Sequence, residues 1–148
     1  MDGVKTLLVT LATGLALATC ASAAADTTPL TGTGWQLVSI DSAGGPTTVD
    51  SPSTFTVTFG ADGHAAFLLD CNRGSGSWQA AAAAPDSGPL SFGPIAVTLM
   101  MCPQPSLDTR VAVALSGVGG WRIDDGQLTM TPASGDTSLH WAPLPDRP

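Results

Sequence analysis

Two cysteines in the middle of this 148-residue chain, Cys71 and Cys102, are its first candidates for chemistry. In an oxidising compartment such an even pair predicts a disulfide. The pair does not form the C-x-x-C motif of redox proteins. A zinc site would need more ligands, and His64 and His140 form no ligand-spaced pair. We therefore expect a disulfide between these cysteines, provided that the chain is exported, and no metal site.

The other polar residues form no recognisable catalytic set. Ser75 and Ser77 lie in a Gly-rich stretch, but the chain has neither a G-x-S-x-G motif nor a phosphate-binding loop. His64 follows an Asp-Gly turn and His140 alternates with apolar residues, so we expect both to be exposed. Many acids lie at predicted turns, where local hydrogen bonding accounts for them: Asp41, Asp62, Asp86, Asp124, Asp125 and Asp136. We expect no catalytic residue and no cofactor.

The N-terminus has the pattern of an export signal. Lys5 precedes an apolar run over residues 7–18, and small residues follow at 21–25. This pattern predicts a signal peptide over residues 1–25 and a periplasmic or secreted protein. The run is short for a membrane span. Cys20 ends a lipobox-like Leu-Ala-Thr-Cys sequence, so lipidation of Cys20 and a lipid-anchored envelope protein are the alternative.

Composition limits the fold and the partners. Only 11% of the residues are charged, no acid is Glu, and Lys5 is the only lysine. Exposed helix faces usually carry Glu and Lys, so this composition argues against a helical bundle. Seventeen Gly and twelve Pro favour many short strands joined by turns. The net charge of −7 excludes a nucleic-acid partner, because phosphate binding needs clustered Lys and Arg.

Period-two alternation predicts strands along most of the chain. The clearest pair is residues 54–59 and 65–69, which an Asp-Gly turn joins into a hairpin. The segments 41–46 and 80–84 are predicted as a turn and a loop. The remaining expected strands cover residues 35–40, 76–80, 90–92 with 95–98, 121–123, 127–131 and 138–141.

One helix is predicted near residues 106–116. Ser106 is a good N-cap, an apolar stripe starts at Leu107, and Gly117 is expected to end the helix in the left-handed conformation. The fold class is therefore mainly β: a small antiparallel barrel or sandwich of about seven or eight strands, with the helix packed over an open end or edge.

Three segments together resemble the META domain, the HslJ-like family of bacterial envelope proteins. They are Gly34-Trp35-Gln36-Leu37, the strand that starts at Cys71-Asn72, and the run from Leu90 to Met101-Cys102-Pro103. The motif residues are Cys71, Asn72, Gly76, Trp78, Met101, Cys102 and Pro103. The chain departs from the family at Gly74, where an aromatic residue is common, and in the approach to Cys71.

The resemblance implies a conical β-barrel with a helix and a role linked to envelope stress, and it transfers no catalytic residue. The expected organisation is a signal peptide at 1–25, a linker at 26–33, the META/HslJ-like domain at 34–142 and a disordered tail at 143–148.

The function hypothesis is a non-catalytic, monomeric envelope protein with a binding or maintenance role. Its partner would be an unknown envelope protein, and it would contact a membrane only if Cys20 is lipidated. One alternative is a barrel whose mouth binds a small apolar ligand, suggested by Trp35, Trp78, Trp121 and Trp141. Another is a protein-interaction module or protease inhibitor. Asn72 is expected to cap a Gly-rich turn or, alternatively, to contact a ligand.

Overall fold

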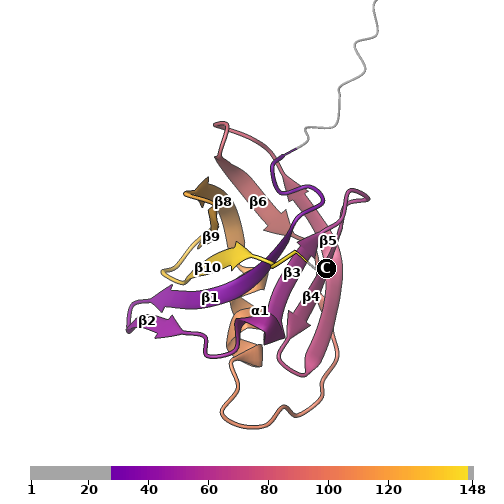
Figure 1. The fold of residues 1–148 in the computed structure, drawn as a ribbon, viewed down its shortest axis with the longest axis vertical. Helices are drawn as coiled ribbons and strands as arrows, with labels where there is room; N and C mark the ends of the chain where they lie inside the picture. Colours follow the sequence, from indigo (N-terminus) through magenta and orange to yellow (C-terminus); the bar gives the residue numbers. More distant parts are fainter. Residues whose placement is uncertain (1–27, 147–148) are drawn as a thin grey trace, which may run out of the picture.

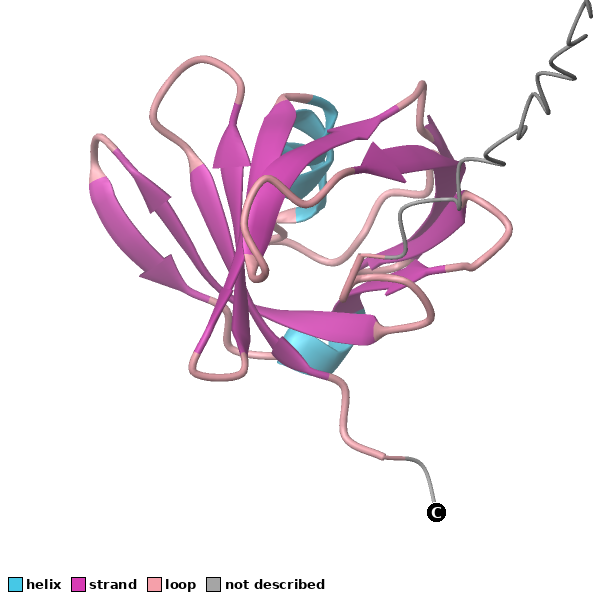
Figure 2. Cartoon of the chain, turned by 90° about the horizontal axis from the view of Figure 1, so that it is seen from above, coloured by secondary structure: helices cyan, strands magenta, loops and turns pink. Residues whose placement is uncertain are grey.

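Eight antiparallel strands close into a barrel in the computed structural model, which describes residues 28–146 (Figure 1, Figure 2). The order around the barrel is β1, β3, β4, β5, β6, β8, β9 and β10, and β10 pairs again with β1. The strands are β1 (Gly34–Ser42), β3 (Phe55–Phe59), β4 (His64–Leu69), β5 (Asn72–Ala80), β6 (Ser87–Phe92), β8 (Val118–Asp124), β9 (Gln127–Pro132) and β10 (Ser138–Pro143). The predicted mainly-β fold is confirmed.

Two further strands and a short helical turn decorate this barrel. Among the described strands, β2 (Gly45–Thr48) pairs with β1 alone. The turn predicted over 41–46 is present but covers only residues 43–44, and the strand that follows it was not predicted. β7 (Ala96–Val97) pairs with the first half of β5, and a 3-10 turn, η1 (Pro52–Thr54), precedes β3. The predicted signal peptide and Cys20 lie outside the described residues.

The β3–β4 hairpin shows how the sequence pattern builds the core. Phe55, Val57 and Phe59 of β3 are buried, whereas the threonines between them face outward. The Asp-Gly turn places Gly63 at φ +80°, a conformation that glycine adopts without strain. Three of the four tryptophans are also buried: Trp35, Trp121 and Trp141. These three side chains therefore belong to the core of the barrel, which argues against a barrel mouth lined by tryptophans.

β5 begins at Asn72, before the predicted start at Gly76, so Gly74 belongs to the strand and not to the expected Gly-rich turn. The chain that follows β6 approaches this part of β5 closely. A Cβ atom on Gly76 would lie 3.1 Å from the carbonyl oxygen of Pro94. Glycine at this position allows the segment before β7 to lie against β5.

The predicted helix is present as α1 (Asp108–Ser116), which packs against β4 and β6. Its buried residues are Val111 and Leu115, from the predicted apolar stripe. Ser106 accepts a hydrogen bond from the Asp108 N–H, although the N-cap position itself is Leu107. The prediction for Gly117 was wrong, because its φ of −98° is not left-handed.

The ordered domain extends past both of its predicted boundaries. Leu30, in the predicted linker, is fully buried, and Gly32 donates a backbone hydrogen bond to Phe59. In the predicted tail, the Leu144 N–H donates to the carbonyl of Gly34. Burial of Leu30 and backbone hydrogen bonds to β3 therefore hold the first segment against the barrel.

Candidate functional site

A disulfide joins the start of β5 to the loop that leads into α1. Cys71 and Cys102 have their Cα atoms 5.4 Å apart, as the sequence predicts for an exported chain. The Cys71 N–H lies 3.2 Å from the sulfur of Cys102. The bond ties the β4–β5 turn to residues 31 positions further along the chain. Because Cys102 lies near the middle of the loop between β7 and α1, the bond fixes the centre of this loop, which is at the bottom of Figure 1.

The side-chain amide of Asn72 holds the same loop. Its oxygen accepts hydrogen bonds from the Met100 N–H at 2.7 Å and the Thr98 hydroxyl at 2.9 Å. Its nitrogen donates to the Met100 carbonyl at 3.0 Å and lies 3.2 Å from a carboxylate oxygen of Asp108. Asn72 is only 3% exposed. The expected capping of a Gly-rich turn was wrong, because the partners lie in a distant loop and at the start of α1.

A second set of contacts fixes the start of α1 to the β4–β5 turn. The Ser106 hydroxyl donates to the Asp70 carboxylate at 2.7 Å, and the Asp108 N–H donates to Ser106 at 3.2 Å. Asp70 has a positive φ of 57° in that turn. The loop between β7 and α1 is thus held by a disulfide, a buried amide and this serine.

Between these anchors the loop exposes large apolar side chains. We call residues 98–101 the methionine loop. Leu99 is 96% exposed, Met101 91% and Met100 63%, and Val113 on α1 is 67% exposed. Single exposed apolar residues are ordinary, but three in a row on an anchored loop are typical of an interaction site. The motif residue Met101 is therefore exposed.

A groove of about 530 Å³ lies between the methionine loop and α1. We call it the helix–loop groove. Leu69 and Asn72 contribute to it from the barrel, and Thr109, Ala112 and Val113 from the helix. Asp108 is the only charged residue in its lining. Sequence reasoning missed this groove, although the uncharged run that contains Leu99 and the two methionines was a usable signal.

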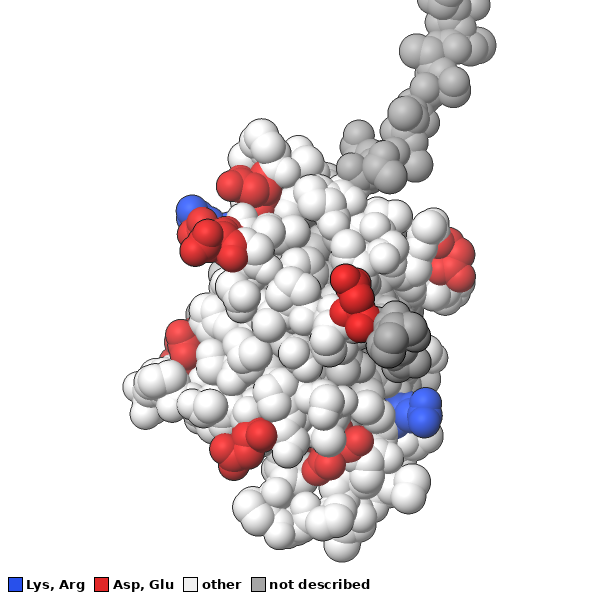
Figure 3. Space-filling view, viewed as in Figure 1, with Lys and Arg blue, Asp and Glu red and all other residues white. Residues whose placement is uncertain are grey.

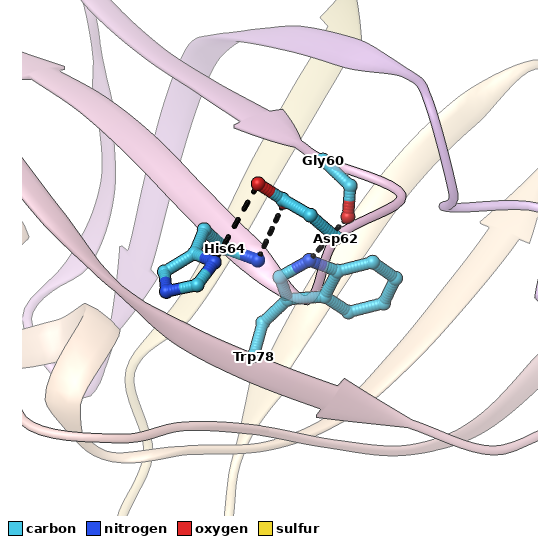
Figure 4. Close-up of polar contacts among 4 residues, drawn as sticks. All are labelled: Gly60, Asp62, His64 and Trp78. Carbon is cyan, nitrogen blue, oxygen red and sulfur yellow. Dashed lines mark hydrogen bonds and ion pairs between the residues drawn. The ribbon is translucent and has the colours of Figure 1, made fainter.

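The remaining motif residues have structural positions. Trp78 is half-buried and donates its indole N–H to the Gly60 carbonyl at 3.0 Å (Figure 4). Its ring packs edge-on against Phe59. Pro103 is exposed directly after the disulfide. These contacts position β5 and the loop and offer no reactive group.

His64 is the first residue of β4, directly after the β3–β4 turn. Its backbone N–H donates to the Asp62 carboxylate at 3.0 Å, and its ring lies 3.6 Å from the same carboxylate (Figure 4). The His64 side chain is 72% exposed, in agreement with the prediction. A hollow of about 690 Å³ adjoins it, but the polar contacts that the structure gives His64 are those of its own turn.

His140 is more enclosed than predicted. Its Nε2 lies 2.9 Å from the Asp41 carboxylate, and its Nδ1 lies 3.2 Å from the Thr129 hydroxyl. Thr129, His140 and Asp41 thus follow the order of nucleophile, base and orienting acid that is known from hydrolase triads. However, each of the three residues lies within a paired strand: Thr129 in β9, His140 in β10 and Asp41 in β1. Asp41 was wrongly placed in a turn by the sequence. The arrangement joins three strands across the barrel seam.

Within residues 28–146 the structure brings no three His, Cys, Asp or Glu side chains together in a metal-binding group. Ser75 and Ser77 lie exposed on β5. No helix in the same part of the chain is long and apolar enough to cross a bilayer.

An eight-stranded antiparallel barrel with one helix and an anchored loop defines the class of this protein. The chain belongs to the META domain family, which matches it over residues 28–142. The match starts within the predicted linker, in agreement with the burial of Leu30.

Solved structures support the fold. The NMR structure of a protein from Burkholderia xenovorans shares 25% identity at a TM-score of 0.64, over 79% of this chain and 85% of that chain. The crystal structure of a duf4847 family protein from Bacteroides vulgatus shares 16% identity at a TM-score of 0.56, over 77% of this chain and 94% of that chain. No curated protein sequence matches the chain.

Proposed function

We propose that this META domain protein is exported to the cell envelope and acts there by binding a protein partner, not by catalysis. The observation that carries the proposal is the methionine loop. Three consecutive large apolar side chains face solvent on a loop that a disulfide and Asn72 hold in place. Holding a contact surface in its bound shape lowers the entropy cost of association. Methionine side chains suit such a surface because they adapt to irregular partners.

Export and the absence of catalysis have separate support. A structural disulfide is typical of oxidising compartments, and the apolar run at residues 7–18 has the length of a signal sequence. Each of the two histidines makes its polar contacts with residues of its own turn or of neighbouring strands. A binding role in envelope maintenance under stress is the physiological setting that we propose.

The mature chain tests export. We expect the full-length gene, expressed in a bacterium, to yield a protein that starts at Asp26 and has the mass of an oxidised cysteine pair. A modified N-terminal Cys20 would keep the protein in the envelope but tether it to a membrane. A cytoplasmic chain that retains residues 1–25 would contradict the proposal.

Site-specific photo-crosslinking in intact cells tests binding. A photoreactive residue at Met101 is expected to give a discrete protein adduct, because this position is 91% exposed on the proposed surface. The same photoreactive residue at Gln127, exposed at the start of β9, is the matched control. Equal labelling from both positions, or none from Met101, would contradict a role for the loop.

A further inference from the structure

We propose that the helix–loop groove binds an extended peptide segment that adds as a strand to the free edge of residues 97–101 and carries a basic side chain toward Asp108. This inference rests on the proposed binding function and names the chemistry of the partner. It is argued from the backbone of the methionine loop, from the shape of the groove and from its charge.

The backbone of residues 97–101 has a strand edge available. β7 pairs with β5 and with no other strand of the described chain. The Thr98 N–H donates to the Arg73 carbonyl, so Thr98 faces β5. Val97 stands opposite Gly74, and in an antiparallel ladder its own N–H and C=O then point to the other side.

Asn72 extends this edge beyond the end of β7. Its amide bonds both the N–H and the C=O of Met100, as a neighbouring strand residue would. Thr98 and Met100 are therefore held on the β5 side. The alternate residues, Leu99 and Met101, make no backbone hydrogen bond with any residue that the structure describes. Unpaired strand edges are templates for a further strand.

The groove has the lining that strand addition requires. Val97 to Cys102 line it together with Thr109, Ala112 and Val113 of α1. A channel between an edge strand and a helix lets main-chain hydrogen bonds supply affinity while alternate side chains enter apolar pockets. The volume of about 530 Å³ falls within the range of specific ligand sites.

Charge selects the partner further. Asp108 is the only charged side chain in the groove, and the chain as a whole carries −7. Asn72 occupies one side of the Asp108 carboxylate, and the remaining acceptor positions can receive a cation. The face in Figure 3 carries more acidic than basic groups, which disfavours an anionic membrane surface. A segment with alternating apolar residues and one Lys or Arg fits these features.

Selection from phage-displayed random heptapeptides on the purified full chain tests the proposal. We expect enriched peptides to alternate large apolar residues and to contain a Lys or Arg. Asp108→Asn keeps a hydrogen-bond acceptor for Asn72 but removes the charge. It should weaken the best basic peptide by about tenfold and leave its Lys→Gln analogue little changed.

Two substitutions at Leu99 test the strand edge. Leu99→Ala removes the side chain and keeps the N–H, whereas Leu99→Pro also removes the outward N–H. We expect Leu99→Pro to weaken peptide binding by about tenfold beyond Leu99→Ala, with both variants unfolding at the same temperature. If Leu99→Pro lowers the unfolding temperature, the wild-type protein is tested instead with peptides N-methylated at alternate residues. These peptides should bind more weakly than the unmethylated peptide by a similar factor.

The outcomes separate this inference from the proposed function. Enrichment of acidic or purely polar peptides, or equal binding by Leu99→Pro and Leu99→Ala, would overturn strand addition. A crosslinked partner at Met101 together with that result would leave the binding function standing. Failure of both the crosslinking and the peptide selection would remove the two proposals together.

Discussion

At the scale of residues, the side chain of Asn72 makes the hydrogen bonds that a neighbouring strand would make with Met100. It bonds both backbone groups of Met100 and the hydroxyl of Thr98, and it is buried against the Cys102 sulfur and the Asp108 carboxylate. A buried amide is stable only when its donors and acceptors are satisfied, and those of Asn72 are. One side chain therefore holds both backbone groups of Met100, within the methionine loop.

Asn72→Ala is expected to destabilise the protein by about 3 kcal/mol, because it leaves buried partners unsatisfied in addition to removing the hydrogen bonds. Urea unfolding measures this loss, and hydrogen exchange at Met100 should accelerate. Gln79→Ala, at an exposed position of the same strand, is the control and should cost less than about 0.5 kcal/mol. Equal stability of the two variants would show that the amide is not the anchor.

At the scale of elements, the disulfide and a glycine decide where loops lie against strands. Cys71 and Cys102 close a span of 31 residues that includes β5, β6 and β7. At the start of β6, Gly88 lies so close to the preceding segment that a Cβ atom would overlap the carbonyl of Ala81. The indole of Trp121 donates to that same carbonyl at 3.1 Å. These contacts depend on the tertiary structure and leave no periodic signal in the sequence.

The variant with both Cys71→Ser and Cys102→Ser should lose about 3–4 kcal/mol of stability, since the open chain gains entropy when it unfolds. Thermal unfolding with and without dithiothreitol gives the measurement. The wild-type protein should lose the same stability on reduction, whereas the double variant should not respond. A melting temperature that reductant leaves unchanged in the wild type would show that the bond does not form in solution.

Gly88→Ala tests the close approach of β6. We expect a loss of about 2–3 kcal/mol, because the obstacle is backbone that cannot move aside as a flexible side chain would. Gly44→Ala is the matched control, since nothing lies within 4 Å of its Cβ position, and it should change stability by less than about 0.5 kcal/mol. Chemical denaturation measures the stability of both variants. Equal stability would show that the Ala81 carbonyl does not restrict the residue at position 88.

The sequence predicted the elements better than the contacts between them. Alternation at Phe55, Val57 and Phe59 predicted β3 because one face of the strand is buried. β2 was missed because a Gly-Pro-Thr-Thr strand that pairs on one edge has no buried face to create a pattern. The partners of Asn72 were missed for a related reason: hydrogen bonds over 28 residues of sequence leave no local trace.

At the scale of the whole molecule, the barrel exists only when its first and last strands meet. β1 and β10 pair along most of their length, with an irregularity between Leu37 and Ser39. His140 crosses this seam to Asp41 at 2.9 Å and reaches Thr129 on β9 at 3.2 Å. Because β1 and β10 are far apart in sequence, their pairing carries a large loop-closure cost. A side-chain link across the seam offsets part of that cost.

A double-mutant cycle of Asp41→Ala and His140→Ala measures the link. The two side chains are 51% and 32% exposed, so solvent screens their interaction, and we expect a coupling energy of about 0.5–1 kcal/mol. The reference cycle is Arg122 with Asp124, which are 3.8 Å apart, 64% and 78% exposed and within one strand. Its coupling should be close to zero, since exposed ion pairs of this geometry contribute little. Urea unfolding of the single and double variants supplies both values. If the seam pair couples no more strongly than the reference pair, backbone pairing and the buried core alone close the barrel.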